Sequence, residues 1–257
     1  MQAIEKLQTG IQGVDLISMG GLPRGRTTLI AGSAGSGKTI LAAQFLAEGI
    51  AKYSETGVFV TFEESPDAIR NNLISMGWDI SSWEDQGKWF FVDASAQVSE
   101  QTTLFSGEYD LGALLARIEN AVQQVNASRV SLDSLGAIFT RFGDKKTIRK
   151  ELFRIASVLR KLGVTATMTA ERIEEYGNIS REGVEEFVAD NVIILRNVLE
   201  DEKRRRTVEI LKFRGTKHQK GEFPFTILQD EGFVVIPLSA IELEYESSDL
   251  RIASGSK

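Results

Sequence analysis

The sequence contains no cysteine and a single histidine, His218, among its 257 residues. Without cysteine the chain has no disulfide and no thiolate metal site, and one histidine cannot build a His-rich metal centre. A Ser-His hydrolase of the usual kind would have to depend on His218 alone. These absences exclude many classes of hydrolase and metalloenzyme.

Long hydrophobic runs are also missing. No stretch approaches the roughly 18 consecutive apolar residues that a membrane span requires. Residues 1–10, MQAIEKLQTG, lack the basic and then apolar pattern of a signal peptide. We therefore expect a cytoplasmic protein that is not attached to a membrane.

Positive charge is not in excess. Lysine and arginine number 30 against 36 aspartate and glutamate residues, a net charge of -6. Nucleic-acid binders normally carry a basic surface, so the composition points away from DNA and RNA. Basic stretches at 141–150 and 203–206 have acidic neighbours, and such runs are more often solvated surfaces than phosphate contacts.

Alternating strand and helix patterns dominate the rest of the chain. Apolar runs predict strands at 27–31, 58–62, 89–93, 129–133, 164–169 and 191–195, and helical periodicity predicts helices at 38–52, 66–76, 110–125 and 146–162. This alternation predicts an α/β fold with a mostly parallel central sheet and helices on both faces. From Arg205 onward, short strands between glycine-containing turns predict antiparallel hairpins at one sheet edge. We expect one domain over 1–240 and a polar tail over 241–257 that resembles an interrupted linker.

Residues 32–39, GSAGSGKT, match the phosphate-loop pattern G-x-x-x-x-G-K-[ST] between a predicted strand and a predicted helix. Glycines allow successive N–H groups to point at anionic oxygens, and the helix adds the positive end of its dipole. Lys38 is expected to reach the β- and γ-phosphates, and Thr39 to place its hydroxyl on Mg²⁺. The predicted contacts to ATP or ADP are Gly35, Ser36, Gly37, Lys38, Thr39 and Ile40.

Acidic residues follow two predicted strands. Asp133 ends the run 129–133, where phosphate-loop enzymes place the aspartate that holds the magnesium shell, although an aspartate there can also be a helix cap. Glu63 and Glu64 follow the run 58–62, at the strand end where ligands of open α/β sheets bind. They could orient the attacking water, or they could be a solvated pair at a helix start.

The segment 212–218, KFRGTKH, places Lys212 and Arg214 on the same side of a predicted strand, before a glycine turn. Two alternating cations could stabilise charge on the γ-phosphate, in this chain's own site or in a neighbour's. The alternative is a basic edge strand that prevents aggregation. Residue types alone do not decide between these interpretations.

Together these motifs resemble the KaiC family, ATPases of the cyanobacterial circadian clock, and most closely the N-terminal half of its members. The resemblance covers nearly the whole chain and rests on ISMGGLPRGRTTLIAGSAGSGKT at 17–39, VFVTFEES at 58–65, RVSLDS at 129–134, ERIEEYG at 171–177, GVEEFVADNVIILRNVLE at 183–200 and RRRTVEILKFRGT at 204–216. It implies a RecA-like fold, a homohexameric ring and ATP held between subunits.

The resemblance also implies roles for individual residues. Glu63 and Glu64 become the catalytic acids, Glu63 and Asp133 join Thr39 around Mg²⁺, and Ser75 contacts the nucleotide. From the neighbouring subunit, the expected nucleotide contacts are Lys212, Phe213, Arg214, Thr216 and His218, with Arg206 as a further candidate. Lys38 and Arg214 would act with the two glutamates in catalysis.

Three departures from the family pattern limit the expected function. Family members have two tandem phosphate-loop halves, and this chain has one such loop. The phosphorylated Ser/Thr pair of the second half would fall near Glu186 and Phe187, which have no hydroxyl, so we expect no autophosphorylation there. The family's first half is a slow ATPase that docks the partner KaiB in its ADP-bound state, but residues 96–109 do not match the pattern expected for that docking.

Two other functions use the same loop. A RecA/RadA-type recombinase needs cationic loops facing DNA, whereas residues 171–190 carry seven acidic residues and two arginines, a sum of -5. A nucleotide-gated assembly module would use ATP to hold a ring together without significant turnover. We retain both as alternatives to the clock-type ATPase.

Overall fold

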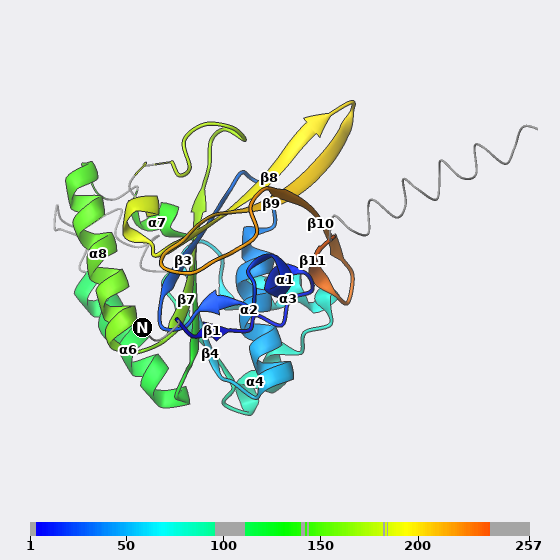
Figure 1. Cartoon of the computed structure of the whole chain (residues 1–257). Helices are drawn as coiled ribbons and strands as arrows, with labels where there is room; N and C mark the ends of the chain where they lie inside the picture. The colour runs from blue at the N-terminus through cyan, green and yellow to red at the C-terminus, as the bar shows by residue number, and fades with distance from the viewer. Residues whose placement is uncertain are drawn as a thin grey trace, which may run out of the picture.

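The computed structural model describes residues 4–95, 111–139, 142, 144–181, 183 and 185–236. Within them, nine strands form one sheet in the order β11-β10-β9-β8-β3-β7-β6-β4-β5 (Figure 1). No helix in the described ranges is both long and apolar enough to cross a membrane. The predicted tail 241–257 and the segment 96–109 lie outside the described residues.

Six neighbouring strands of this sheet, from β8 to β5 in the sheet order, are parallel. They are β3 (Thr27–Gly32), β4 (Gly57–Thr61), β5 (Trp89–Asp93), β6 (Arg129–Asp133), β7 (Thr165–Glu171) and β8 (Asn191–Glu200). All six residues of β3 are buried, as expected for a strand covered on both faces. The predicted α/β fold with a mostly parallel sheet is confirmed, and its RecA-like class follows from this order and the phosphate-loop position.

Helices cover both faces of this sheet (Figure 1). Leu29 and Ala31 of β3 belong to the hydrophobic core under α6 (Leu111–Val125) and α8 (Lys145–Lys161), whereas Ile30 belongs to the core under α2 (Lys38–Tyr53). Side chains alternate between the two faces of a strand, so one strand supplies both cores. The remaining helical segments are α1 (Val14–Ile17), α3 (Pro66–Leu73), η1 (Ile74–Met76), α4 (Ile80–Asp85), α7 (Leu135–Phe139) and α9 (Glu185–Val188).

Antiparallel strands extend the sheet on the β8 side, as predicted. They are β9 (Lys203–Phe213), β10 (Glu222–Leu228) and β11 (Gly232–Val235). Strand β8 continues to Glu200, beyond the predicted end at residue 195, because it goes on pairing with β9 after its pairing with β3 ends at Leu195. The two strands form a long hairpin that projects from the sheet (Figure 1).

Local sequence signals correctly mark several element boundaries. Ser65 accepts a hydrogen bond from the Ala68 N–H at 3.3 Å and Pro66 occupies the first turn of α3, as predicted from their positions. The predicted helix 66–76 changes to a 3₁₀ turn after Leu73 and ends at Gly77, whose φ is 74°. The short segments β1 (Lys6–Leu7), β2 (Leu22–Pro23), α1, α4, α7 and α9 escaped prediction, because such lengths show no hydrophobic period.

A buried arginine joins the N-terminal segment to the sheet. Arg129, which is 1% exposed, forms an ion pair with Glu55 and donates to the carbonyls of Gln8 at 2.7 Å, Phe45 at 2.8 Å and Thr9 at 3.3 Å. Burial lowers the pKa of Arg129, and these partners compensate the loss of hydration. The guanidinium of Arg129, the first residue of β6, is therefore held in a fixed position between α2 and the N-terminal segment.

We expect Gly49→Ala to lower the free energy of unfolding by about 2 kcal/mol, because the added Cβ would lie 2.4 Å from Nε of Arg129. Helix propensity alone predicts the opposite sign, since alanine is the better helix former. Gly136→Ala in α7 is the matched control: its Cβ meets nothing closer than 3.6 Å. Denaturant unfolding of both variants checks this; a Gly49→Ala protein as stable as the control would contradict it.

Candidate functional site

The phosphate loop lies at the carboxyl edge of the parallel sheet, between β3 and α2. Gly35 and Gly37 have φ values of 71° and 91°, which glycine adopts without strain. A Cβ at Gly37 would also lie 2.8 Å from the Ile227 side chain. Gly37 caps α2 without any side-chain hydrogen bond from the described residues, so the first N–H groups of this helix remain available for an anion.

Lys38 folds back over the loop. Its Nζ donates to the carbonyls of Gly32 and Ser33, each at 2.9 Å. Burial lowers the pKa of Lys38, and the nearby carboxylates of Asp133, Glu171, Glu63 and Glu175 oppose that shift. The ammonium is thus held beside the loop, where an incoming phosphate can replace the carbonyls.

Asp133 and Thr39 form the pair expected around magnesium. Thr39 Oγ1 donates to Asp133 Oδ2 at 2.8 Å, and the Thr169 hydroxyl donates to Oδ1. Burial raises the pKa of Asp133, which its hydrogen bonds with Thr169 and Thr39 counteract. The described residues contain no group of three or more His, Cys, Asp or Glu side chains that could hold a metal. The Thr39 hydroxyl and the Asp133 carboxylate are oxygen donors of the kind that Mg²⁺ prefers, so this pair would fit a magnesium ion whose other ligands are phosphate oxygens and water.

Glu63 and Glu64 follow β4 and diverge within the same pocket. Glu63 Oε1 accepts from Ser134 Oγ at 2.7 Å, and Glu64 Oε2 accepts from Asn72 Nδ2 at 2.8 Å. Glu63 contributes to the electrostatic environment of both Lys38 and Asp133. Both carboxylates are exposed to the pocket, where a water molecule could reach them.

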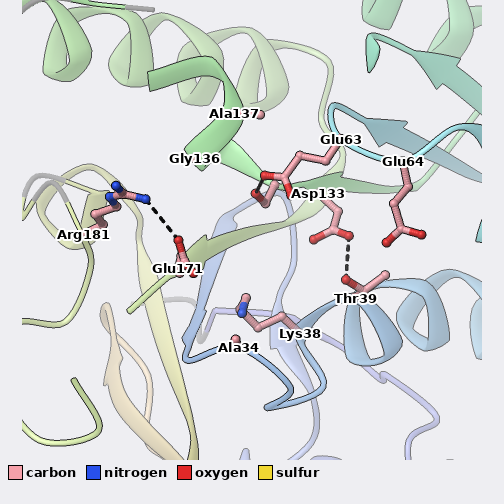
Figure 2. A pocket seen from close by; sticks show the side chains of 11 residues that line it. Ala34, Lys38, Thr39, Glu63, Glu64, Asp133, Gly136, Ala137, Glu171 and Arg181 are labelled. Carbon is pink, nitrogen blue, oxygen red and sulfur yellow. Dashed lines mark hydrogen bonds and ion pairs between the residues drawn. The ribbon is translucent and has the colours of Figure 1, made fainter. Parts of the chain in front are cut away.

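These side chains surround one pocket of about 320 Å³ (Figure 2). Glu171 and Arg181, paired at 3.3 Å, close one side of it, opposite Glu64 and Thr39. Sequence reasoning missed Glu171, Arg181 and Ser134 as lining residues. Glu171 could have been found by the rule that identified Asp133, because both are acidic residues at the carboxyl ends of parallel strands. The lining residues are Ala34, Lys38, Thr39, Glu63, Glu64, Asp133, Ser134, Gly136, Ala137, Glu171 and Arg181.

The segment 212–218 lies at the amino end of the parallel strands, whereas the phosphate loop lies at their carboxyl end. Phe213 pairs with Asn191, which pairs with Thr28 at the start of β3, whereas the phosphate loop begins beyond Gly32, opposite Leu195. The strand between these two levels is roughly 13 Å long. This separation argues against a contribution of the segment to its own chain's site, and a contribution to a neighbour's site stays a prediction.

Within this segment the cations have local partners. Lys212 Nζ donates to the carbonyls of Glu186 at 3.2 Å and Ala189 at 3.0 Å, and Arg214 lies 3.6 Å from Asp190. The rings of Phe213 and His218 are 5.5 Å apart. Thr216, which lies between these two residues in the sequence, is half-buried.

Three other predicted contacts are not among the described residues that line the pocket. Arg206 donates to the Gly35 carbonyl of its own chain at 3.3 Å, which places it at its own loop rather than with Lys212. Ser75 is exposed in η1, donates to the Asn72 carbonyl at 3.5 Å, and is not among the described residues that line the pocket. Ile40 is half-buried in the first turn of α2.

Comparison with known proteins supports one family. A family model described as "ATPase: KaiC" matches residues 7–240. The "Circadian clock protein KaiC3" of Synechocystis sp. is 68% identical over 254 residues, which cover 99% of this chain and 50% of that protein. The "Circadian clock oscillator protein KaiC" of Synechococcus elongatus is 53% identical over 254 residues, covering 99% and 48%. The protein of the same name from Thermostichus vulcanus has the same identity and coverage. The chain thus spans about half the length of these curated relatives.

We expect Asp133→Asn to raise the free energy of unfolding of the nucleotide-free chain near neutral pH. Burial raises the pKa of Asp133 in the folded chain above its unfolded value, so the ionised carboxylate is unfavourable in the fold. That penalty is present above the folded pKa and disappears below the unfolded pKa. The gain over wild type should therefore shrink toward acid pH.

Denaturant unfolding at several pH values measures this gain. Glu63→Gln is the matched control, because it removes an exposed carboxylate from the same pocket and should change stability by less than about 0.5 kcal/mol. An Asp133→Asn variant that is less stable than wild type at neutral pH would show that the buried charge is compensated.

Proposed function

This chain belongs to the KaiC ATPase family, and we propose that it binds Mg·ATP and hydrolyses it slowly at the subunit interfaces of a homohexameric ring. The observation that carries the proposal is the convergence of Lys38, the Thr39–Asp133 pair and Glu63 on one pocket at the end of an uncapped helix. Each group matches a requirement of phosphoryl transfer: anion binding, metal placement and water activation.

The proposed reaction assigns one task to each of these side chains. The N–H groups of the loop and the first turn of α2 bind the phosphates, and Lys38 moves from its two carbonyl partners to the β- and γ-oxygens. Thr39 and Asp133 hold the metal ion, which when bound neutralises charge on the transferred phosphoryl group. Glu63 orients the attacking water and accepts its proton. We favour Glu63 over Glu64 because the Glu63 carboxylate accepts from Ser134, the neighbour of Asp133, whereas the Glu64 carboxylate accepts from Asn72 of α3.

The separation of Lys212–His218 from its own phosphate loop supports the ring. Lys212 and Arg214 lie at the amino end of the parallel strands, away from their own phosphate loop. From there they can contact a nucleotide only if it is bound to another copy of the chain. Arg214 is half exposed and paired with Asp190 at 3.6 Å, so it can exchange this partner for a phosphate oxygen. A site completed by a neighbour also makes ATP part of the interface, which links nucleotide binding to assembly.

Partner binding and clock function are proposals drawn from the family. The relatives carry circadian-clock names, and we propose that this chain serves as a timing and assembly domain that docks a KaiB-like protein. The segment 96–109, where docking is expected, lies outside the described residues. Glu186 and Phe187 belong to α9, and we propose no autophosphorylation at these positions.

Replacing both pocket glutamates tests the chemistry. We expect Glu63→Gln/Glu64→Gln to lower the rate of phosphate release at least about 100-fold, because general-base assistance is worth that much. ATP affinity should remain within a few-fold, since Lys38 and the loop are intact. Glu63→Gln alone should cause most of the loss, and Glu64→Gln alone should cause little.

Phosphate release and Mg·ATP binding, measured on the same preparations, separate the outcomes. Unchanged turnover in the double variant would contradict the acid assignment. Tight ATP binding by a wild-type protein without any turnover would favour the nucleotide-gated assembly module instead.

Mixing two inactive variants tests whether the site is shared. Arg214→Ala removes the finger and leaves the glutamates; Glu63→Gln/Glu64→Gln does the reverse. After subunit exchange, equal amounts should recover roughly a quarter of the wild-type rate per chain, because about one interface in four joins the two intact halves. Native mass spectrometry with and without ATP monitors the assembly. No recovery from mixed rings, or a monomer under all conditions, would contradict the shared site.

A further inference from the structure

Both residues whose carbonyls hold Lys38, Gly32 and Ser33, form hydrogen bonds with the chain segment that follows β7. The Gly32 carbonyl, which accepts from Lys38 at 2.9 Å, also accepts from the Arg172 N–H at 3.0 Å. The Ser33 carbonyl accepts from Lys38 at 2.9 Å, and the Ser33 hydroxyl donates to Glu175 Oε1 at 2.6 Å. Arg172 therefore holds Gly32 and Glu175 holds Ser33, and these two loop residues in turn hold Lys38.

Glu175 is itself held from the other side. Its second oxygen, Oε2, accepts from the Asn197 N–H at 3.0 Å, so one carboxylate connects the phosphate loop with β8. Its backbone carbonyl accepts from Arg196 Nε at 3.3 Å. Arg196 is 7% exposed and paired with Glu209 at 2.6 Å and Glu222 at 3.2 Å. The Glu175 carboxylate thus has a defined position set by the β8–β9–β10 sheet.

We propose that Glu175 is a positioning residue of the ATP site, which holds Ser33 and through the Ser33 carbonyl places the Lys38 ammonium before the nucleotide binds. Glu175 is not among the described residues that line the pocket, so it acts through Ser33 rather than on the phosphates. A carboxylate facing the triphosphate would repel it, whereas one that accepts from a loop hydroxyl orders the loop from outside. This inference rests on the proposed function.

The alternative is that Glu175 only fastens the segment 171–181 to the sheet. Its bond to Asn197 and the contacts of Arg196 would serve that purpose equally well. The two interpretations differ at Ser33: a fastening role predicts lower stability with unchanged ATP affinity. A positioning role predicts that the effects of Ser33 and Glu175 on affinity depend on each other.

A double-mutant cycle decides between them. Ser33→Ala, Glu175→Ala and the double variant are titrated with Mg·ATP by calorimetry, and KM and kcat are measured by phosphate release. We expect each single variant to weaken affinity about fivefold, because without the bond between Ser33 and Glu175 the loop must be ordered when the nucleotide binds. The double variant should be no weaker than either single one, and KM should rise with little change in kcat.

Glu174→Ala is the matched control, because Glu174 has the same charge, adjoins Glu175 and is exposed. Alone it should leave affinity unchanged, and combined with Ser33→Ala it should add nothing. Ser33→Ala truncates only a loop hydroxyl, so it keeps the test valid if Glu175→Ala unfolds.

The possible results have distinct meanings. Losses that multiply in the double variant, or an unchanged affinity in Ser33→Ala, overturn the positioning role while the proposed function stands. A wild-type chain that binds no Mg·ATP overturns the proposed function and this inference with it. Equal, non-multiplying losses in the two single variants with a wild-type control variant support both.

Discussion

Parallel pairing of β3 with β7 and β8, and of β6 with β4 and β7, is the constraint on which the site depends. It brings the carboxyl ends of four strands to one edge, so that the phosphate loop, the glutamates after β4, Asp133 and Glu171 meet around one pocket. Burial of the strands on both faces keeps this register, because a slip would move apolar side chains to the wrong core. The packing of the buried strands therefore fixes the positions of the functional side chains at their carboxyl ends.

Strand β6 carries two charges with opposite physical roles. Arg129, at its start, is buried but surrounded by Glu55 and three carbonyls, and it joins the N-terminal segment to the sheet. Asp133, at its end, is half-buried with two hydroxyl donors as partners, and loss of hydration raises its pKa. The first charge is satisfied within the chain, whereas the second would gain from the cation of the proposed site. At one end of β6, Arg129 stabilises the fold, and at the other end Asp133 belongs to the candidate site.

The antiparallel strands β9, β10 and β11 make the two ends of the sheet differ. Strand β9 runs back along β8, so residues 212–218 end at the edge opposite the phosphate loop. The same hairpin also places Arg196 and Asn197 beside Glu175, and Arg206 beside Gly35. At one end, the β8–β9 hairpin therefore contacts the phosphate loop of its own chain and the Glu175 that holds this loop. At the other end it presents the cations that, in the proposed ring, complete a neighbouring site.

Local pattern in the sequence determined the alternation of strands and helices, the phosphate loop, and the acidic residues at the ends of β4 and β6, because period, turn chemistry and motif spacing are short-range properties. The family followed from motifs spread along the chain. Only the tertiary structure showed that Arg181 lines the pocket and that Glu175 holds Ser33, 142 residues away in the sequence. It also separated residues 212–218 from their own site. Such contacts depend on strand order and register, which arise from the packing of the whole sheet rather than from any single segment.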